Sequence, residues 1–220
     1  MSKRPAPNVK SKSNRRSLAQ VRQDNSEHIL RVAERLFSER GYSGTTIMAI
    51  AEEACLPKAN ILYYFHTKEA LYQGVLSNIL KIWMLSMNDM TPEQHPRDAL
   101  RDYIIKKIRQ SKEYPHASRI FAAEVLHGAP FLRKQLETDL KEQFDKTCDV
   151  FRQWIAKKWM DPVHPEHLMF MLWSSTQAYA DVQVQSCILL NKSELDDQDY
   201  NDGADFLVRM VLKGCGINPV

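Results

Sequence analysis

Apolar residues recur at the three- and four-residue spacing of an α-helix through most of the chain, and this pattern limits the possible folds more than any other feature. The longest such stripe predicts a helix from about residue 130 to 158. Its members are Leu132, Leu136, Leu140, Phe144, Cys148, Phe151 and Ile155. No segment reads as a convincing strand, and 7 glycines in 220 residues are few for a turn-rich β protein. We therefore expect an all-α fold.

The same spacing predicts an ordered series of helices that begins after a polar segment. Residues 1–25 are rich in Lys, Ser, Asn and Pro and are expected to form a disordered basic arm. The first helix is expected to have Ser26 as its N-cap and to end at Gly41. Besides 130–158, later helices are predicted over residues 67–89, 97–112, 117–127, 165–188 and 199–213.

Residues 45–65 predict two short helices joined by a three-residue turn. Thr45 or Thr46 is suited to cap the first of them, and Pro57 stands where a proline is tolerated at the start of the second. This spacing is typical of a helix-turn-helix, in which the second helix enters the major groove of DNA.

Positive charge is concentrated in the amino-terminal third of the chain. Residues 1–66 hold 11 Lys or Arg and 6 Asp or Glu, a net charge of +5, whereas residues 67–220 hold 19 and 21, a net charge of −2. A basic front suits a polyanionic partner such as DNA. For the first 15 residues, a solubilising tail explains the composition equally well.

On the second short helix, Ile61 and Phe65 are four residues apart and are expected to face inward. The opposite side then presents residues suited to a DNA groove, because lysine and tyrosine bind phosphates and asparagine reads adenine edges. The predicted DNA-binding residues are Thr46, Lys58, Ala59, Asn60, Tyr63, Tyr64 and Lys68. For Tyr64 an alternative is equally open, that its ring covers the junction with the next helix.

These residues carry a resemblance to a known family. The run GYSGTTIMAIAEEACLPKANILYYFHTKEALY resembles the DNA-binding domain of TetR-family transcriptional regulators, and the match covers about residues 26–72. Leu62 departs from the pattern, since the family more often has tyrosine there, so no phosphate contact is carried over to it. The runs EYPHASRIFAAEVLHGAP and HLMFMLWSSTQAYAD are similar to RutR-type regulators of pyrimidine utilisation.

The resemblance implies a division into domains and a homodimer that binds an operator in double-stranded DNA. Residues 26–66 would be the DNA-binding domain, and residues 67–220 a larger helical domain for effector binding and dimerisation. The two predicted helices over 165–188 and 199–213 would pair with their counterparts in a second copy. The function that the resemblance implies is a repressor that responds to a small-molecule effector, with a pyrimidine such as uracil as the candidate.

A cluster of polar residues lies within the otherwise apolar helix over 165–188. Gln177 offers a donor and an acceptor side by side, as the edge of a uracil-like ring requires, and Trp83 or Trp173 could stack on its face. The predicted ligand-binding residues are Trp83, Trp173, Ser174, Thr176, Gln177 and Tyr179. Alternatively, these polar groups pair across the dimer interface.

The sequence gives little support for an enzyme. The only close histidine pair, His164 and His167, lacks a third ligand and is interpreted as a solvated capping segment. No catalytic residue, metal site or cofactor is predicted. The four cysteines, Cys55, Cys148, Cys187 and Cys215, are far apart and are expected to be reduced and mostly buried, with Cys55 in the core of the turn.

Two other expectations concern the cell and the class of protein. No run is apolar enough to cross a bilayer and the start lacks the apolar stretch of a signal peptide, so we expect a cytoplasmic protein without membrane contact. Three alternatives to a pyrimidine-responsive regulator remain: a TetR-type regulator of another small molecule, a DNA-binding protein without an effector, and a helical adaptor that binds an acidic protein rather than DNA.

Overall fold

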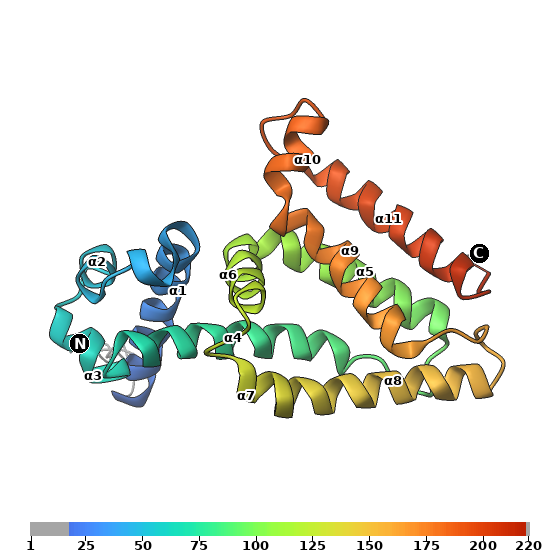
Figure 1. Cartoon of the computed structure of the whole chain (residues 1–220), viewed down its shortest axis with the longest axis horizontal. Coiled ribbons are helices and arrows are strands. Elements are labelled where there is room, and N and C mark those ends of the chain that lie inside the picture. Colours follow the sequence, from blue (N-terminus) through green and yellow to red (C-terminus); the bar gives the residue numbers. More distant parts are fainter. Residues whose placement is uncertain (1–17, 219–220) are drawn as a thin grey trace, which may run out of the picture.

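The computed structural model describes residues 18–218, and these residues form helices with no strand among them (Figure 1). A small group at one end contains α1 (Leu18–Gly44), α2 (Ile47–Glu53) and α3 (Lys58–Phe65). From it α4 (Lys68–Met87) runs into a larger group. The larger group contains α5 (Pro96–Glu113), α6 (Pro115–Leu126), α7 (Arg133–Gln135), the π-helix η1 (Leu136–Leu140), α8 (Lys141–Ala156), α9 (Pro165–Asp181), α10 (Gln183–Leu189) and α11 (Asp197–Gly214). The expected all-α fold is confirmed.

The small group is held together by one apolar face from each of its helices. Ile29, Ala33, Ile50 and Ile61 are fully or almost fully buried against one another in a single cluster. Thr46 caps α2, because its hydroxyl accepts a hydrogen bond from the Ala49 N–H at 3.0 Å. These contacts fix the angle between α2 and α3.

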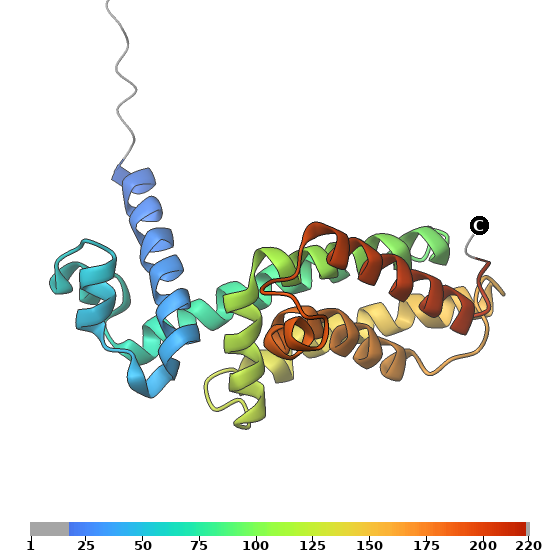
Figure 2. The same cartoon turned by 90° about the horizontal axis from the view of Figure 1, so that it is seen from above.

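The larger group has a second core, in which α5 packs against both α9 and α11. Phe151 and Trp154 of α8 are completely buried in it. Helix α4 contributes to both cores: Leu71 lies in the first and Met87 in the second. Helix α4 is therefore a rod that joins the two groups, as both views of the molecule show (Figures 1 and 2).

Several expected boundaries are corrected by the structure. Helix α1 begins at Leu18, so Ser26 lies within it rather than capping it, and residues 18–25 do not belong to a disordered arm. The remaining residues of that predicted arm, 1–17, lie outside the described part of the chain. Gly41 does interrupt the helix, with φ of 69°, before helical turns resume up to Gly44.

Two further corrections concern the carboxy-terminal half and the turn. The predicted helix over 165–188 is broken at Val182, which has φ of −116° and ψ of 27°, into α9 and α10. Cys55 is exposed and not in the core, because its φ of 53° turns the side chain outward between α2 and α3. None of the helices within 18–218 is both long and apolar enough to span a membrane.

Candidate DNA-binding surface and effector cavity

The outward face of α3 is polar, and the structure leaves it open. Lys58, Ala59 and Asn60 are exposed in its first turn, and Tyr63 is exposed to 61% one turn later. Thr46 is exposed at the start of α2. Ile61 is completely buried on the opposite side, which orients the helix as the sequence predicted. A helix with this face has the composition needed to contact phosphates and base edges in a major groove.

Tyr64 and Lys68 are held by contacts within the protein. The hydroxyl of half-buried Tyr64 accepts a hydrogen bond from the Asn25 side chain of α1 at 3.3 Å. The ammonium of Lys68 donates to the carbonyl oxygens of Tyr42 and Thr45, at 2.9 and 3.1 Å, and lies 4.3 Å from the centre of the Tyr42 ring. Lys68 therefore joins the start of α4 to the segment between α1 and α2, a structural role that the sequence analysis did not anticipate.

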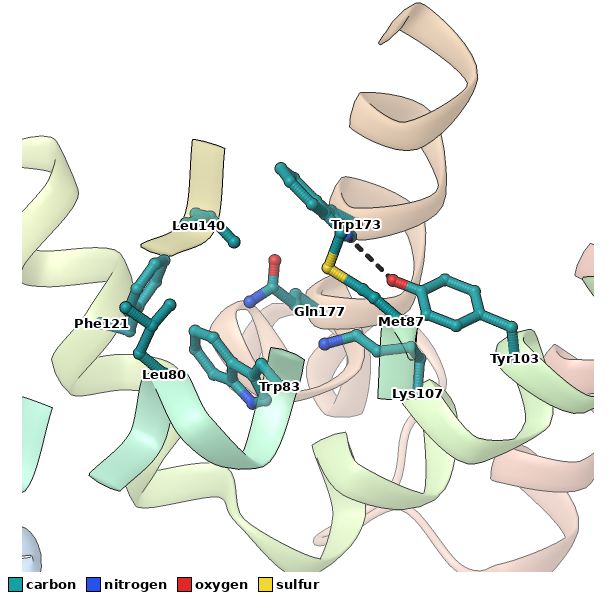
Figure 3. Close-up of a pocket in the computed structure, with 9 residues that line it drawn as sticks. All are labelled: Leu80, Trp83, Met87, Tyr103, Lys107, Phe121, Leu140, Trp173 and Gln177. Atoms are coloured by element: carbon teal, nitrogen blue, oxygen red, sulfur yellow. Dashed lines mark hydrogen bonds between the residues drawn. The ribbon is translucent and has the colours of Figure 1, made fainter. Parts of the chain in front are cut away.

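A small cavity of about 40 Å³ lies between α4, α5, α6 and α9 in the larger group (Figure 3). Its lining is mostly aromatic and aliphatic, with two polar side chains, Lys107 and Gln177, that point into it. The residues around it are Leu80, Trp83, Met87, Tyr103, Lys107, Phe121, Leu140, Trp173 and Gln177. An apolar hollow with a few convergent polar groups is the usual form of a small-molecule site.

The aromatic walls of the cavity are fixed by contacts with one another. Trp83 meets the ring of Phe121 edge-on, with 4.3 Å between the ring centres. The indole N–H of Trp173 donates to the hydroxyl oxygen of Tyr103 at 2.9 Å. Burial raises the pKa of Tyr103, so its O–H stays protonated. The rings are thus positioned before any ligand arrives.

Lys107 is the one cationic group in the lining. Its side chain is only 3% exposed, and no hydrogen bond or ion pair to its ammonium is found within the described residues 18–218. The ammonium lies 4.9 Å from the centre of the Trp83 ring, a cation–π contact. Burial lowers the pKa of Lys107 to about 8, against a smaller opposing effect of Asp181. An unpaired buried charge of this kind favours a ligand oxygen.

Half of the predicted ligand-binding residues line this cavity. Trp83, Trp173 and Gln177 come together there, since positions 173 and 177 share one face of α9. Ser174, Thr176 and Tyr179 do not, because they point to other sides of that helix.

Each of the other three has a different environment. Ser174 is exposed, and its hydroxyl donates back to the Phe170 carbonyl at 2.9 Å. The hydroxyl of the completely buried Thr176 donates to the Leu172 carbonyl at 2.7 Å. Tyr179 lies against α11, with its ring 6.0 Å from that of Tyr200.

Lys107 and Tyr103 were missed by the sequence analysis although a signal was present. Both stand on the apolar stripe of α5 that includes Leu100, Ile104 and Ile108, all of them buried. A lysine within such a stripe buries a charge, which costs stability unless the charge has a partner. Its presence therefore indicates a binding site. The aromatic contribution of α6 carried no comparable signal, because a phenylalanine on an amphipathic helix is ordinary core.

Helices α9 and α11 carry an exposed apolar face on the outer side of the larger group. Phe170 and Met171 of α9 and Phe206 and Met210 of α11 are between 44% and 56% exposed. Large apolar side chains gathered in this way make this face a candidate surface for contact with another protein. The histidine pair lies at the edge of this face, with 5.7 Å between the ring centres of His164 and His167. Within 18–218 no cluster of three or more metal-ligating side chains is found.

Comparisons with known proteins agree with this arrangement. Residues 29–75 match the model of bacterial regulatory proteins of the tetR family, and residues 76–218 match that of the YcdC-like protein, C-terminal region. The chain is 38% identical over 186 residues to the HTH-type transcriptional regulator RutR of Escherichia coli strain K12, covering 84% of this chain and 88% of RutR. These relatives are transcriptional regulators and not enzymes.

Two solved structures share this fold at a lower sequence identity than RutR has. A putative fatty acid metabolism regulator of Clostridium perfringens superposes with a TM-score of 0.65 at 22% identity, over 87% of this chain and 100% of that one. AibR, solved in complex with isovaleryl coenzyme A and operator DNA, gives a TM-score of 0.64 at 19% identity, over 89% and 98%. At these identities the two structures bear on the fold alone.

Proposed function

This chain belongs to the TetR family of DNA-binding transcriptional regulators and is similar to RutR, and we propose that it represses transcription until a small planar heterocycle, a pyrimidine such as uracil, enters the cavity. The observation that carries this proposal is the connection between the two sites by a single helix. Lys68, beside the recognition helix α3, and Trp83, in the cavity wall, both belong to α4.

The chemistry of the cavity supports a flat ligand with alternating donors and acceptors. Trp83 and Trp173 offer ring faces for stacking, and the Gln177 amide offers one donor and one acceptor to the ligand edge. The Lys107 ammonium then pairs with a ring carbonyl oxygen, which relieves an unpaired buried charge. A pyrimidine with an N–H between two carbonyl groups meets all three requirements.

In this proposal, effector control is a shift between two states. A ligand that pushes on Trp83 favours a different orientation of α4, and α4 carries the small group with it through Lys68 and the buried Leu71. In a homodimer this changes the separation of the two recognition helices, which need to reach half-sites about 34–36 Å apart. The ligand lowers operator affinity only by the ratio of its affinities for the two states.

The homodimer itself is part of the proposal. The exposed apolar face of α9 and α11 would pack against the same face of a second copy, in an arrangement with twofold symmetry. Each copy would then present one α3 to one half of a palindromic operator.

The DNA-binding part of the proposal is tested by selection from a random duplex library followed by titration against salt. We expect an enriched palindromic sequence and an affinity that falls steeply as salt rises. An adaptor for acidic proteins would enrich no sequence. The repressor assignment predicts lower transcription from a promoter that carries the selected sequence, and higher transcription there would contradict it.

The effector part is tested by a thermal-shift screen with nucleobases, repeated in the presence of the selected duplex. A binding pyrimidine should raise the melting temperature and release the duplex. Gln177→Ala should abolish this response and leave DNA affinity unchanged, whereas Ser174→Ala, outside the cavity on the same helix, should respond as the wild type does. A full response in the Gln177 variant would remove this residue from the site.

A further inference from the structure

The first turns of α1 lie beside the recognition helix. The guanidinium of Arg22 lies over the ring of Tyr63, 5.5 Å from its centre, and Asn25 donates to the hydroxyl of Tyr64 at 3.3 Å. The two tyrosine rings meet edge-on, with 5.3 Å between their centres. Two side chains of α1 thus hold two side chains on the carboxy-terminal half of α3.

Arg22 stands where the buried stripe of α1 continues beyond the core. It precedes Ile29 and Ala33, both completely buried, by seven and eleven positions, so all three lie on nearly the same side of the helix. Figure 2 shows that these first turns extend away from the larger group. At this point the core has ended, and an arginine replaces the apolar residue that the stripe would otherwise carry.

The charge of Arg22 is directed to solvent and is not neutralised by the protein. Arg22 is exposed, and among the described residues no carboxylate forms an ion pair with it. The nearest acidic residues in sequence, Asp24 and Glu27, lie about 140–160° away around the helix at 100° per residue. These two carboxylates accept hydrogen bonds from Gln20 and Gln23 on their own side of α1.

Cation–π contact alone does not account for this arrangement. An exposed pair of this kind stabilises the protein only slightly, and Tyr63 is itself one of the residues expected to contact DNA. A planar guanidinium fixed beside that ring is oriented in advance for a phosphate on the same strand, and little side-chain entropy remains to be lost on binding.

We propose that Arg22 binds a DNA phosphate next to the one contacted by Tyr63, so that the DNA-binding surface extends from α3 onto the first turns of α1. This inference rests on the proposed DNA-binding function and adds a contact outside the helix-turn-helix. The contact positions the protein on the duplex and reads no base.

The test measures binding by fluorescence anisotropy between 50 and 300 mM salt, with two 30-base-pair duplexes, one of mixed sequence and one enriched by selection. One phosphate contact changes the slope of log affinity against log salt by about 0.9. At 0.15 M salt, 0.15 raised to the power of about −0.9 is about five. Arg22→Ala should therefore lower the affinity for both duplexes about fivefold at that salt concentration. Arg22→Lys should keep the wild-type slope, because it keeps the charge.

A matched control is available on the same helix. Arg31 is also exposed, and nine positions from Arg22 it lies about 180° around α1. Arg31→Ala removes the same charge from the full-length protein and should leave both slope and affinity at their wild-type values.

Three outcomes would overturn the inference. The first is an Arg22→Ala variant that binds with the wild-type slope and affinity. The second is an equal loss of DNA affinity in the Arg22→Ala and Arg22→Lys variants with the salt slope unchanged, which would mean that Arg22 only orients Tyr63. The third is an equal loss in the Arg31 variant, which would reflect net charge alone. If the wild-type protein bound neither duplex, the proposed function itself would fail, and that result is distinct from these three.

Discussion

A buried lysine without a partner costs stability, and Lys107 is such a residue. Its pKa of about 8 lies below the ordinary value of 10.5, because burial penalises the charged form. Below pH 8 both the folded and the unfolded chain carry the proton, so the full penalty is present. Between pH 8 and 10.5 the folded protein has released its proton while the unfolded chain still holds it, and stability rises with pH over this window.

The substitution Lys107→Met should remove this penalty. The difference between a pKa of about 8 and the ordinary 10.5 corresponds to about 3 kcal/mol, so we expect the variant to be more stable than the wild type by roughly that amount at pH 7. The difference should shrink between pH 8 and 10, as measured by urea unfolding at both ends of that range. A constant difference across the range would contradict the assignment, and Lys106→Met, at an exposed ion pair with Asp89, is the control.

Lys68 and Lys58 have different expected roles: Lys68 holds the fold together, whereas Lys58 is expected to contact DNA. Lys68→Met should lower the free energy of unfolding by about 2 kcal/mol, because two carbonyl oxygens lose a charged donor. Lys58→Met, at an exposed position, should leave stability unchanged and weaken DNA binding. Paired denaturation and anisotropy measurements check both, and a fully stable Lys68 variant with weaker DNA binding would restore Lys68 as a phosphate contact.

At the scale of the helix, sequence periodicity predicted which segments are helical but not where contacts extend or interrupt them. Residues 18–25 carry no clear apolar stripe, and their helix is stabilised by Arg22 and Asn25 against α3. Such contacts between distant segments are invisible to a local pattern. The predicted helix over 165–188 likewise breaks at Val182 without a proline or glycine from which the break could have been predicted. The cavity was only half predicted, because Trp173 and Gln177 share a helix whereas Lys107 and Phe121 arrive from two others.

The contact between Tyr179 of α9 and helix α11 depends on one glycine, Gly203. A Cβ atom at Gly203 would lie 2.1 Å from the Tyr179 hydroxyl oxygen and 2.5 Å from the carbon that bears it. Gly203→Ala should therefore push the two helices apart and lower the melting temperature, with a cost of about 1–3 kcal/mol. Gly214→Ala, where a Cβ meets nothing within 4 Å, should be tolerated.

A double substitution tests whether Tyr179 is the cause. In the background of Tyr179→Ala, the further change Gly203→Ala should cost little, since the obstructing ring is gone. Additive losses in the double variant, measured by chemical denaturation, would show that another contact limits the approach of the two helices.

For the whole molecule, a buried carboxylate of α6 ties this helix to the first core, beside α4. Glu124 of α6 is 4% exposed and accepts hydrogen bonds from the backbone N–H groups of Phe131 and Leu132, at 2.6 and 3.2 Å. The hydroxyl of Tyr72 on α4 also donates to it, at 3.4 Å. Helix α6 also contributes Phe121 to the cavity wall. In the proposed mechanism, a change in the cavity would reach the small group through α4 and through α6, which packs against α1.

The last prediction concerns the assembly of two copies. Met210 is 56% exposed on the apolar face of α11, and in the proposed homodimer it is covered. Met210→Glu places a charge there that must be buried without a partner, which costs several kcal/mol and should yield monomers in sedimentation analysis. Monomers address one half-site at a time, so affinity for the selected palindrome should fall by at least tenfold, whereas affinity for a single half-site should stay the same.

Asn201→Asp is the matched control for that experiment. Position 201 is exposed on the same helix and lies about 180° around it from Met210, so the variant adds the same charge on the side that faces away from the proposed partner. This variant should remain dimeric and bind the palindrome as the wild type does. A dimeric Met210 variant with wild-type affinity would mean that the two copies pair through another surface, and the spacing expected for the recognition helices would then no longer follow from α9 and α11.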